Sequence, residues 1–210
     1  MPRYRDLGAL QEEFAQRKGA IRKRVEEFSA TPAEAYFYEL AYCLLTPQSS
    51  ARDAALAVAA LEAAGFRDRA FDPAPLLHQP GYYIRFHVTK GKRLVAAKAQ
   101  WETILHALAG HGADSRELRA WLVHNVQGLG WKEASHFLRN IGHRNLAILD
   151  RHILRNLKRH GVLGSLPASF TPKRYLAVER AFGEFARRVG VSMDELDLLF
   201  WSRETGDILK

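Results

Sequence analysis

Cysteine is almost absent from this sequence of 210 residues, in which Cys43 stands alone. One cysteine cannot form a disulfide within the chain, nor can it supply four thiolates to an iron–sulfur cluster. Long apolar runs are also missing, since no segment approaches the roughly 18 residues that cross a bilayer. The first ten residues, MPRYRDLGAL, lack the apolar core of a signal peptide. We therefore expect a soluble cytoplasmic protein, with no membrane partner and with Cys43 buried on an apolar helix face.

The residues that are abundant indicate a packed, basic domain. Hydrophobic residues make up 47% of the chain, enough for a substantial core and against disorder. Lys and Arg outnumber Asp and Glu, which gives a net charge of +8 and a pI near 9.8. A polyanionic partner is favoured, although basicity alone is also compatible with an anionic membrane surface or with plain solubility.

Helical spacing dominates the chain. Apolar residues recur every three or four positions, and no long alternating strand pattern occurs, so the fold is predicted to be all-α. Capping boxes are predicted at Thr31-Pro32-Ala33-Glu34 and Ser192-Met193-Asp194-Glu195, and Thr171-Pro172 places proline at a first helical position. Besides one helix directly after Gly130, helices are expected over residues 7–28, 32–45, 54–64, 92–109, 115–125, 151–161, 172–189 and 196–201.

The stretch VQGLGWKEASHFLRNIGHRNLAILDRHILR, residues 126–155, combines several features that suggest chemistry. Residues 127–130, Gln-Gly-Leu-Gly, form a tight turn between two helical segments, and their glycines leave backbone N–H groups uncovered next to a helix start. Such N–H groups are suited to bind phosphate. Lys132 follows the turn beside Trp131, and Asp150 ends an apolar run as the expected N-cap of the next helix.

The patterns GLGWKEASHFLRNIG and AILDRHILRNL resemble the helix-hairpin-helix, Gly/Pro-rich loop and aspartate superfamily of DNA glycosylases. Together with an ending in Ile208, Leu209 and Lys210, they are similar to its small second family of 8-oxoguanine DNA glycosylase/AP lyases. The match is close over the central third and looser elsewhere. The chain departs from the endonuclease III branch, which usually carries a four-cysteine iron–sulfur loop.

The resemblance implies one two-lobed domain with DNA in a cleft between the lobes. A middle lobe of residues 36–130 would be inserted into a terminal lobe formed by residues 1–35 and 131–210. The implied activity is bifunctional: excision of 8-oxoguanine, then strand cleavage by Schiff-base β-elimination. The partner would be double-stranded DNA containing 8-oxoguanine or abasic sites, bound by a monomer at the nucleoid.

Lys132 and Asp150 are the predicted catalytic residues. A lysine with the usual pKa near 10.4 is almost wholly charged at pH 7, so Lys132 must lose a proton before its amine attacks C1′ of the sugar. Asp150 would help to remove that proton and stabilise the cationic sugar. The plain alternatives are a surface lysine and an ordinary N-cap.

Substrate recognition is assigned to residues outside this pair. Gln48, in Leu44-Leu45-Thr46-Pro47-Gln48, resembles a glutamine that fills the gap left by a flipped base. Trp201 and Phe86 would stack on the base, unless they are core aromatics. In the resembling family the α-carboxylate of the final lysine, here Lys210, accepts the hydrogen that 8-oxoguanine carries on N7.

DNA phosphates would be bound by backbone N–H groups of the turn, formed by Gln127, Gly128, Leu129 and Gly130, without sequence readout. Arg151 is expected to join them, and the other candidates for the phosphate track are Arg139, Arg155, Lys158 and Arg159. No cofactor is required, although carbonyl groups of the turn offer a place for a monovalent cation. No metal is expected, because the histidines lack ligand spacing with cysteines or carboxylates. The spaced pairs, expected at the surface or facing DNA, are His106 with His111 and His136 with His143.

Two other functions stay open at this point. The same scaffold could excise an oxidised pyrimidine or a mispaired adenine, but the ending in Lys210 disfavours both, and Lys132 disfavours a monofunctional adenine glycosylase. A non-catalytic helix-hairpin-helix DNA-binding module would explain the charge and the glycine turn. In such a module, however, the presence of Lys132 and Asp150 at this spacing would be a coincidence.

Overall fold

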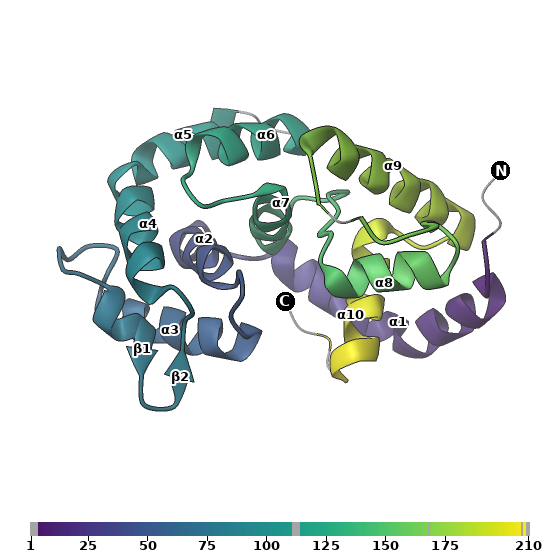
Figure 1. Cartoon of the computed structure of the whole chain (residues 1–210), viewed down its shortest axis with the longest axis horizontal. Coiled ribbons are helices and arrows are strands. Elements are labelled where there is room, and N and C mark those ends of the chain that lie inside the picture. Colours follow the sequence, from purple (N-terminus) through teal and green to yellow (C-terminus); the bar gives the residue numbers. More distant parts are fainter. Residues whose placement is uncertain (1–3, 111–113, 168, 207, 209–210) are drawn as a thin grey trace. The chain divides into compact units, whose positions relative to one another are not determined.

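The computed structural model describes residues 4–110, 114–167, 169–206 and 208. The fold of these residues is all-α, as predicted (Figure 1). The helices are α1 (Leu7–Ser29), α2 (Tyr36–Leu45), α3 (Ala51–Ala63), α4 (His87–Ala99), α5 (Trp101–Gly110), α6 (Ser115–Asn125), α7 (Trp131–Asn140), α8 (Arg151–Arg159), α9 (Pro172–Val189) and α10 (Met193–Thr205). None of the helices in these ranges has the length and hydropathy needed to span a bilayer.

Short elements join some of these helices. Two 3₁₀ turns, η1 (Ala33–Ala35) and η2 (Ala74–Leu77), precede α2 and the only strands of the described ranges. These strands, β1 (His78–Gln79) and β2 (Tyr82–Tyr83), form an antiparallel hairpin in which His78 is paired with Tyr83. The hairpin is too short to disturb the helical class.

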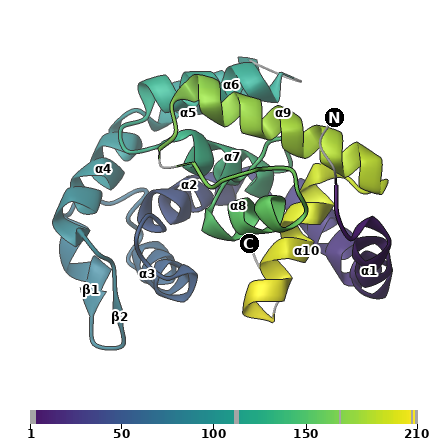
Figure 2. The same cartoon turned by 45° about the vertical axis from the view of Figure 1, so that its right-hand side comes forward.

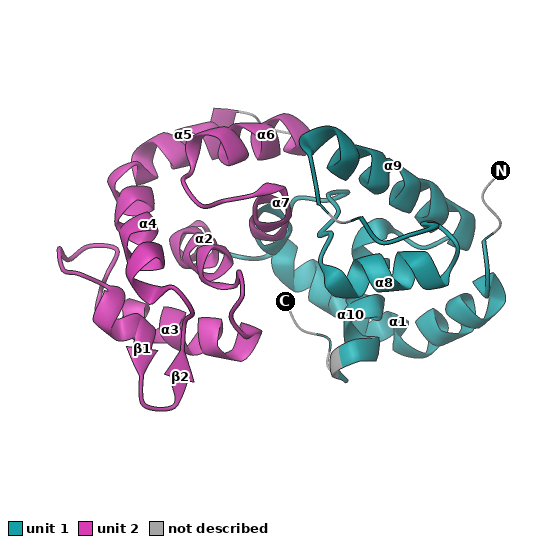
Figure 3. Cartoon of the chain, viewed as in Figure 1, with its two compact units in different colours: residues 1–31, 138–210 teal, residues 32–137 magenta. Residues whose placement is uncertain are grey.

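The chain divides into two compact units (Figure 3). Unit 1 comprises residues 1–31 and 138–210, and unit 2 comprises residues 32–137. The second division falls inside α7, so this helix contributes its first turns to unit 2 and its end to unit 1.

Unit 1 is built around α10, which packs against α1, α8 and α9 (Figures 1 and 2). Leu196, Leu199 and Phe200 on this helix are fully buried. The ring of Phe200 stacks on His160 at 5.7 Å between centroids, and His160 stacks in turn on Phe185 at 5.7 Å. Burying side chains of this size stabilises a fold by about 1.5–3 kcal/mol each, so α10 is a major apolar support of unit 1, and Phe200 holds the end of α8 through His160.

Unit 2 is built around α2, whose residues 40–45 are all buried. Within this unit α4, α5 and α6 follow one another in an arc around α2 (Figures 1 and 2). Phe37 makes an edge contact with Trp101 at 5.2 Å and lies 6.1 Å from Phe66. The apolar run that ends α2 thus anchors the loop of residues 46–50, which carries Gln48.

Three predicted helix starts are confirmed. Asp150 caps α8, the Thr171 hydroxyl accepts a hydrogen bond from the amide of Arg174 at the start of α9, and Ser192 forms a capping box with Glu195 on α10. In each case a side-chain oxygen takes up amide groups that the first helical turn leaves without partners.

The capping box predicted at Thr31 is wrong. Ala33–Ala35 form a 3₁₀ turn whose N-cap, Pro32, makes no side-chain hydrogen bond. The Thr31 hydroxyl instead donates to the backbone carbonyl of Asn140 at 2.9 Å. The hydroxyl therefore donates to a distant carbonyl instead of accepting from a local backbone amide.

The single helix predicted over residues 92–109 is also wrong. It begins earlier, at His87, and is interrupted at Gln100, where α4 ends and α5 begins. The change of direction lets Trp101 bury its ring against Phe37. An apolar spacing that continues across a break cannot show this turn, because both helices bury the same kind of residue.

Candidate active site and DNA-binding elements

The glycine turn between α6 and α7 has the conformation that its sequence predicts. The amide of Leu129 donates to the carbonyl of Val126 at 3.1 Å, and Leu129 is buried, so its side chain anchors the turn from inside. Gly128 has a φ of +92°, and a Cβ there would lie 2.4 Å from Cδ of Arg93. Only glycine fits at this position without strain.

The turn of residues 127–130 lies directly before α7, which begins at Trp131. Within the described part of the chain, the amides of Gly128 and Gly130 donate no hydrogen bond to another residue, and Gln127 is exposed. N–H groups beside a helix N-terminus carry partial positive charge and attract phosphate. The turn therefore retains donors for a phosphate.

Lys132 lies in the first turn of α7 and is partly accessible, with 29% of its side chain exposed. Its Nζ forms an ion pair with Oε1 of Glu133 at 3.0 Å. Arg119 on α6 supports this turn, since its guanidinium lies over the Trp131 ring at 4.9 Å and donates to the Ser135 hydroxyl at 3.1 Å. The lysine is thus presented at a rigid helix start with a carboxylate beside it.

Asp150 uses its two carboxylate oxygens differently. Oδ1 accepts from the amides of His152 and Ile153, both at 2.8 Å, which is the N-cap interaction. Oδ2 accepts from Nε1 of Trp201 at 3.1 Å. The carboxylate is therefore fixed in orientation by α8 and α10 together, and the cap and a further role are compatible.

Trp201 and His152 form the immediate surroundings of Asp150 in unit 1. Their rings meet edge to face at 5.9 Å, and Nδ1 of His152 lies 3.4 Å from Oε2 of Glu204. Trp201 is half-buried. The Nε1–H group of its indole is thus used in the hydrogen bond to Asp150, while part of the ring remains accessible.

Gln48 and Phe86 both lie at exposed turns of unit 2, and both have left-handed backbones. Gln48 has a φ of 57° and Phe86 a φ of 61°. The Phe86 ring is 49% exposed, and the Arg85 guanidinium lies over it at 4.8 Å. Neither residue belongs to the core, so the alternative of a core aromatic is wrong for Phe86.

Arg151 lies at the start of α8, directly after Asp150, and is exposed. Three further basic residues of α8 are exposed at helical spacing from it: Arg155, Lys158 and Arg159. These four side chains give α8 a basic exposed face beginning next to the Asp150 carboxylate. A run of cations at this spacing is suited to a phosphate backbone.

A family model described as 8-oxoguanine DNA glycosylase matches residues 21–191. The chain belongs to the 8-oxoguanine DNA glycosylase family. The resemblance inferred from residues 126–155 is thereby confirmed, as is the helix-hairpin-helix glycosylase fold.

Relatives of this family are similar over nearly the whole chain. An 8-oxoguanine DNA glycosylase/AP lyase of Korarchaeum cryptofilum is 40% identical over 191 residues, which cover 90% of each sequence. The crystal structure of the Thermotoga maritima 8-oxoguanine DNA glycosylase superposes with a TM-score of 0.85 at 33% identity, covering 97% of this chain and 98% of the other. A Methanocaldococcus jannaschii 8-oxoguanine glycosylase/lyase, in complex with a 15mer DNA containing 8-oxoguanine, superposes with a TM-score of 0.84 at 29% identity, covering 96% and 100%.

Within this family member, two sequence-based placements need correction. Arg139 does not lie on a phosphate track, because it is buried, with its guanidinium 4.4 Å above the Phe28 ring and 3.4 Å from Oδ2 of Asp197. His136 is not at the surface but is buried with its ring edge-on to Tyr42 at 5.7 Å. Every residue of α7 from 134 to 140 is buried, so this part of the helix presents no exposed face to DNA.

Sequence reasoning missed several charged residues around the family's site elements. Glu133, the partner of Lys132, could have been noticed from its position next to the lysine. Asp197 is fully enclosed, and burial raises its pKa to about 7, a rise that Asp150 and Asp194 reinforce and that the nearby Arg139 only partly opposes. Lys90 is buried at 2% exposure.

Lys132 belongs to unit 2 and Asp150 to unit 1. Lys210 lies outside the described residues, so its assigned part in base recognition stays a prediction. The pairing that the structure does add is Trp201 with Asp150, two residues assigned separately to stacking and to catalysis.

Proposed function

We propose that the chain is a bifunctional DNA glycosylase/AP lyase that flips 8-oxoguanine out of duplex DNA, excises it and cleaves the strand. The observation that carries this proposal is a lysine and a capping aspartate at two helix starts, Lys132 and Asp150, in a member of the 8-oxoguanine DNA glycosylase family. A binding module of the same family would need neither residue.

The proposed reaction begins at C1′ of the flipped nucleotide. Deprotonated Nζ of Lys132 forms a bond to C1′ as the C1′–N9 bond breaks, and the base leaves with that electron pair and takes up a proton. Asp150 stabilises the positive charge that develops on the sugar and accepts the proton that Nζ loses. Glu133, in an ion pair with Lys132, holds the amine in place before DNA binds.

Strand cleavage follows from the same bond. The C1′–O4′ bond opens, O4′ takes up a proton, and a Schiff base remains between Nζ and C1′. Loss of a proton from C2′ then expels the 3′ phosphate by β-elimination. Water hydrolyses the Schiff base and returns the free lysine, so protein side chains and water account for every step, without a cofactor.

DNA is held by contacts that read its backbone. The amides of Gly128 and Gly130 bind one phosphate, and carbonyls of the same turn offer a place for a monovalent cation. Arg151 and the exposed cations of α8 bind others. Extruding a base costs a few kcal/mol of stacking and pairing. Gln48 fills the gap that the flipped base leaves in the duplex, and Phe86 and Trp201 stack on the flipped base. We propose that the chain acts as a monomer in the cytoplasm, at the nucleoid.

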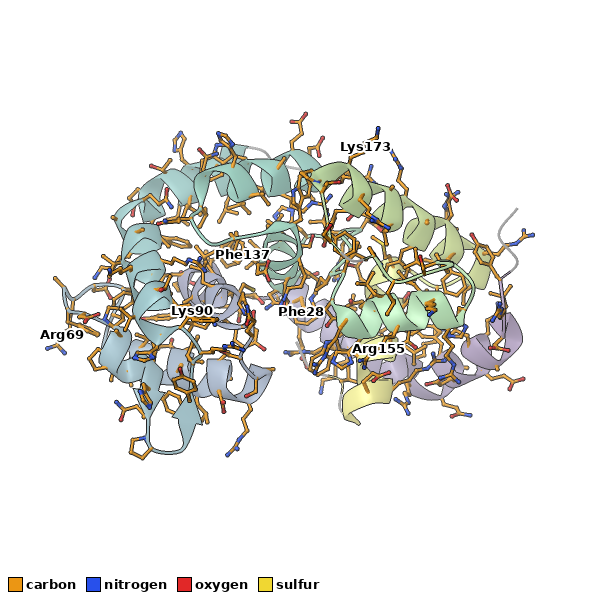
Figure 4. All side chains as sticks on the ribbon, viewed as in Figure 1. Phe28, Arg69, Lys90, Phe137, Arg155 and Lys173 are labelled. Carbon is orange, nitrogen blue, oxygen red and sulfur yellow. The ribbon has the colours of Figure 1, made fainter. Side chains whose placement is uncertain are left out.

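Borohydride trapping tests this function. Wild type should be trapped covalently on an 8-oxoguanine:cytosine duplex and not on an undamaged duplex, and Lys132→Gln should abolish the trapped band. Lys173→Gln is the matched control, since Lys173 is exposed on α9 and has no proposed contact with the site (Figure 4). Trapping that survives in Lys132→Gln would refute the assignment of the nucleophile.

A panel of duplexes tests the substrate. Excision of thymine glycol, or of adenine opposite 8-oxoguanine, at a rate equal to or above that of 8-oxoguanine would contradict the proposed specificity. Duplex binding without base release or cleavage would instead support a non-catalytic module. The salt concentration must be fixed across the panel, because phosphate-driven affinity falls steeply as salt rises.

A further inference from the structure

Lys90 is a buried ammonium whose hydrogen-bonding capacity is fully used. It lies on α4 in unit 2, and its side chain extends towards the end of α2 (Figure 4). Its Nζ donates to the carbonyl of Leu45 at 2.7 Å, to the carbonyl of Pro47 at 2.6 Å and to the Ser49 hydroxyl at 3.1 Å. An ammonium has three donors, and here they are taken by the last residue of α2 and by two residues of the loop that follows it.

This arrangement is costly for stability. A buried charge is unfavourable unless it is paired and hydrogen-bonded, and the three acceptors of Lys90 are uncharged. Burial, together with the positive charges of Arg93 and Lys132 and against an opposing effect of Glu133, lowers its pKa to about 8. An apolar side chain would fill the same space without this penalty, so the three hydrogen bonds of Lys90 indicate a role beyond packing.

The acceptors lie at the end of α2 and in the loop of residues 46–50 that follows it and carries Gln48. Leu45 ends α2, where carbonyl groups lack helical partners, and Pro47 and Ser49 flank Gln48 on both sides. Gln48 is exposed, with a left-handed backbone. Fixing both neighbours therefore fixes the direction in which the glutamine side chain leaves the loop.

The same contacts reach the segment that carries Phe86. The Ser49 hydroxyl accepts both from Lys90 and from the amide of Arg85, the latter at 3.1 Å. Phe86 follows at once, again with a left-handed backbone. A left-handed conformation costs a residue with a side chain roughly 1–2 kcal/mol, so both turns would relax if nothing held them.

We infer that Lys90 is a positioning residue that holds the gap-filling Gln48 and the base-stacking Phe86 in their left-handed turns, ready for a flipped nucleotide. This inference rests on the proposed function. Lys90 acts through the two loops and touches neither the sugar nor the base. Its loss should therefore impair extrusion and capture of the base, and spare the lyase step at a sugar that has already lost its base.

The test compares two lysines of the same helix. Lys98 also donates from α4 to two carbonyls, those of Phe66 and Arg69, both at 2.7 Å. Neither acceptor belongs to a segment with a predicted DNA contact. Lys90→Met and Lys98→Met thus remove the same kind of interaction from the same helix, and only the first releases Gln48 and Phe86.

Single-turnover rates with enzyme in excess give the decisive readout. For Lys90→Met, 8-oxoguanine excision should fall about tenfold or more, while cleavage of a preformed abasic duplex stays within about threefold of wild type; a tenfold change corresponds to 1.36 kcal/mol in the barrier. Lys98→Met should leave both rates unchanged. Equal losses in the two variants, or equal losses of excision and cleavage in Lys90→Met, would overturn the inference.

Two further measurements keep the outcome clear. Circular dichroism and thermal unfolding check folding, and if Lys90→Met does not fold, Ser49→Ala removes the shared hydroxyl and should lower excision in the same direction. Affinity for a duplex with a tetrahydrofuran abasic analogue requires no chemistry. It should fall about tenfold in the Lys90 or Ser49 variant, even if wild type fails to excise 8-oxoguanine; an unchanged affinity would refute the positioning role independently of the proposed function.

Discussion

Trp201 should contribute to catalysis through its N–H group as well as through its ring. Its Nε1 donates to Oδ2 of Asp150 at 3.1 Å, the oxygen that the helix cap leaves available. Trp201→Phe removes this donor and keeps an aromatic face. Trp201→Ala removes both. Comparing the two variants separates orientation of the carboxylate from stacking on the base.

The expected size of the effect follows from the type of bond. A hydrogen bond to a charged group contributes about 1.5–3 kcal/mol, and each 1.36 kcal/mol corresponds to a tenfold change in rate. If most of this energy orients Asp150 in the transition state, Trp201→Phe should lower the single-turnover rates of excision and of abasic-site cleavage by roughly tenfold to hundredfold. Affinity for the 8-oxoguanine duplex should change little, whereas Trp201→Ala should also weaken binding.

A double-mutant cycle with Asp150→Asn makes this reasoning refutable. The asparagine side chain can still cap α8 through its carbonyl oxygen, but its amide would face the indole N–H, donor against donor. Trp201→Phe should therefore cost nothing further in that background. If Trp201→Phe lowers the rate equally in the wild-type and Asp150→Asn backgrounds, Trp201 does not act through Asp150. Wild-type rates in Trp201→Phe alone would show that the hydrogen bond does not contribute to catalysis.

Two other predictions concern the turn and the buried carboxyl. Gly128→Ala should weaken duplex binding in a filter-binding assay, because the new Cβ would meet Arg93 and the backbone has a φ of +92°. Gly190→Ala is the control for backbone strain, since Gly190 has a φ of +80° but open space around it. Equal duplex affinities of the two variants would contradict the phosphate role of the turn. Burial raises the pKa of Asp197 in the folded protein to about 7, above its value in the unfolded chain. Ionisation of this carboxyl therefore destabilises the fold, and the free energy of unfolding should rise as the pH falls from 7 towards 4. Asp197→Asn should flatten this part of the pH dependence in urea unfolding; parallel profiles would argue against it.

Most of the fold could be predicted because its signals are local. A helix start such as Asp150 or Ser192 depends on residues two or three positions away. Thr31 has the same local pattern, but its hydroxyl found a partner in Asn140, more than a hundred residues further along the chain. The break between α4 and α5 at Gln100 could not be predicted for a related reason, because it depends on the packing of Trp101 against Phe37, which is far away in the sequence.

The candidate site was predictable where a motif carried it. Lys132 and Asp150 could be proposed from the residues around them, and their local environments as helix starts are as expected. The bond between Trp201 and Asp150 could not, because it joins α8 to α10 across 51 positions of sequence. Sequence reasoning assigned the two residues separate tasks, and packing on α10 is what brings them into contact.

Buried cations were missed, although the sequence does contain a signal for them. With α4 beginning at His87 rather than Lys92, Lys90 falls on the same stripe of this helix as Leu94 and Ala97, both of which are buried. Arg139 is likewise buried, in a part of α7 where every residue from 134 to 140 is buried. A charged residue on an apolar stripe must find hydrogen-bond acceptors inside the protein. For Lys90 those acceptors are the loop around Gln48, so a correct helix boundary alone would have directed attention to a lysine of α4 that reaches a proposed DNA-binding element.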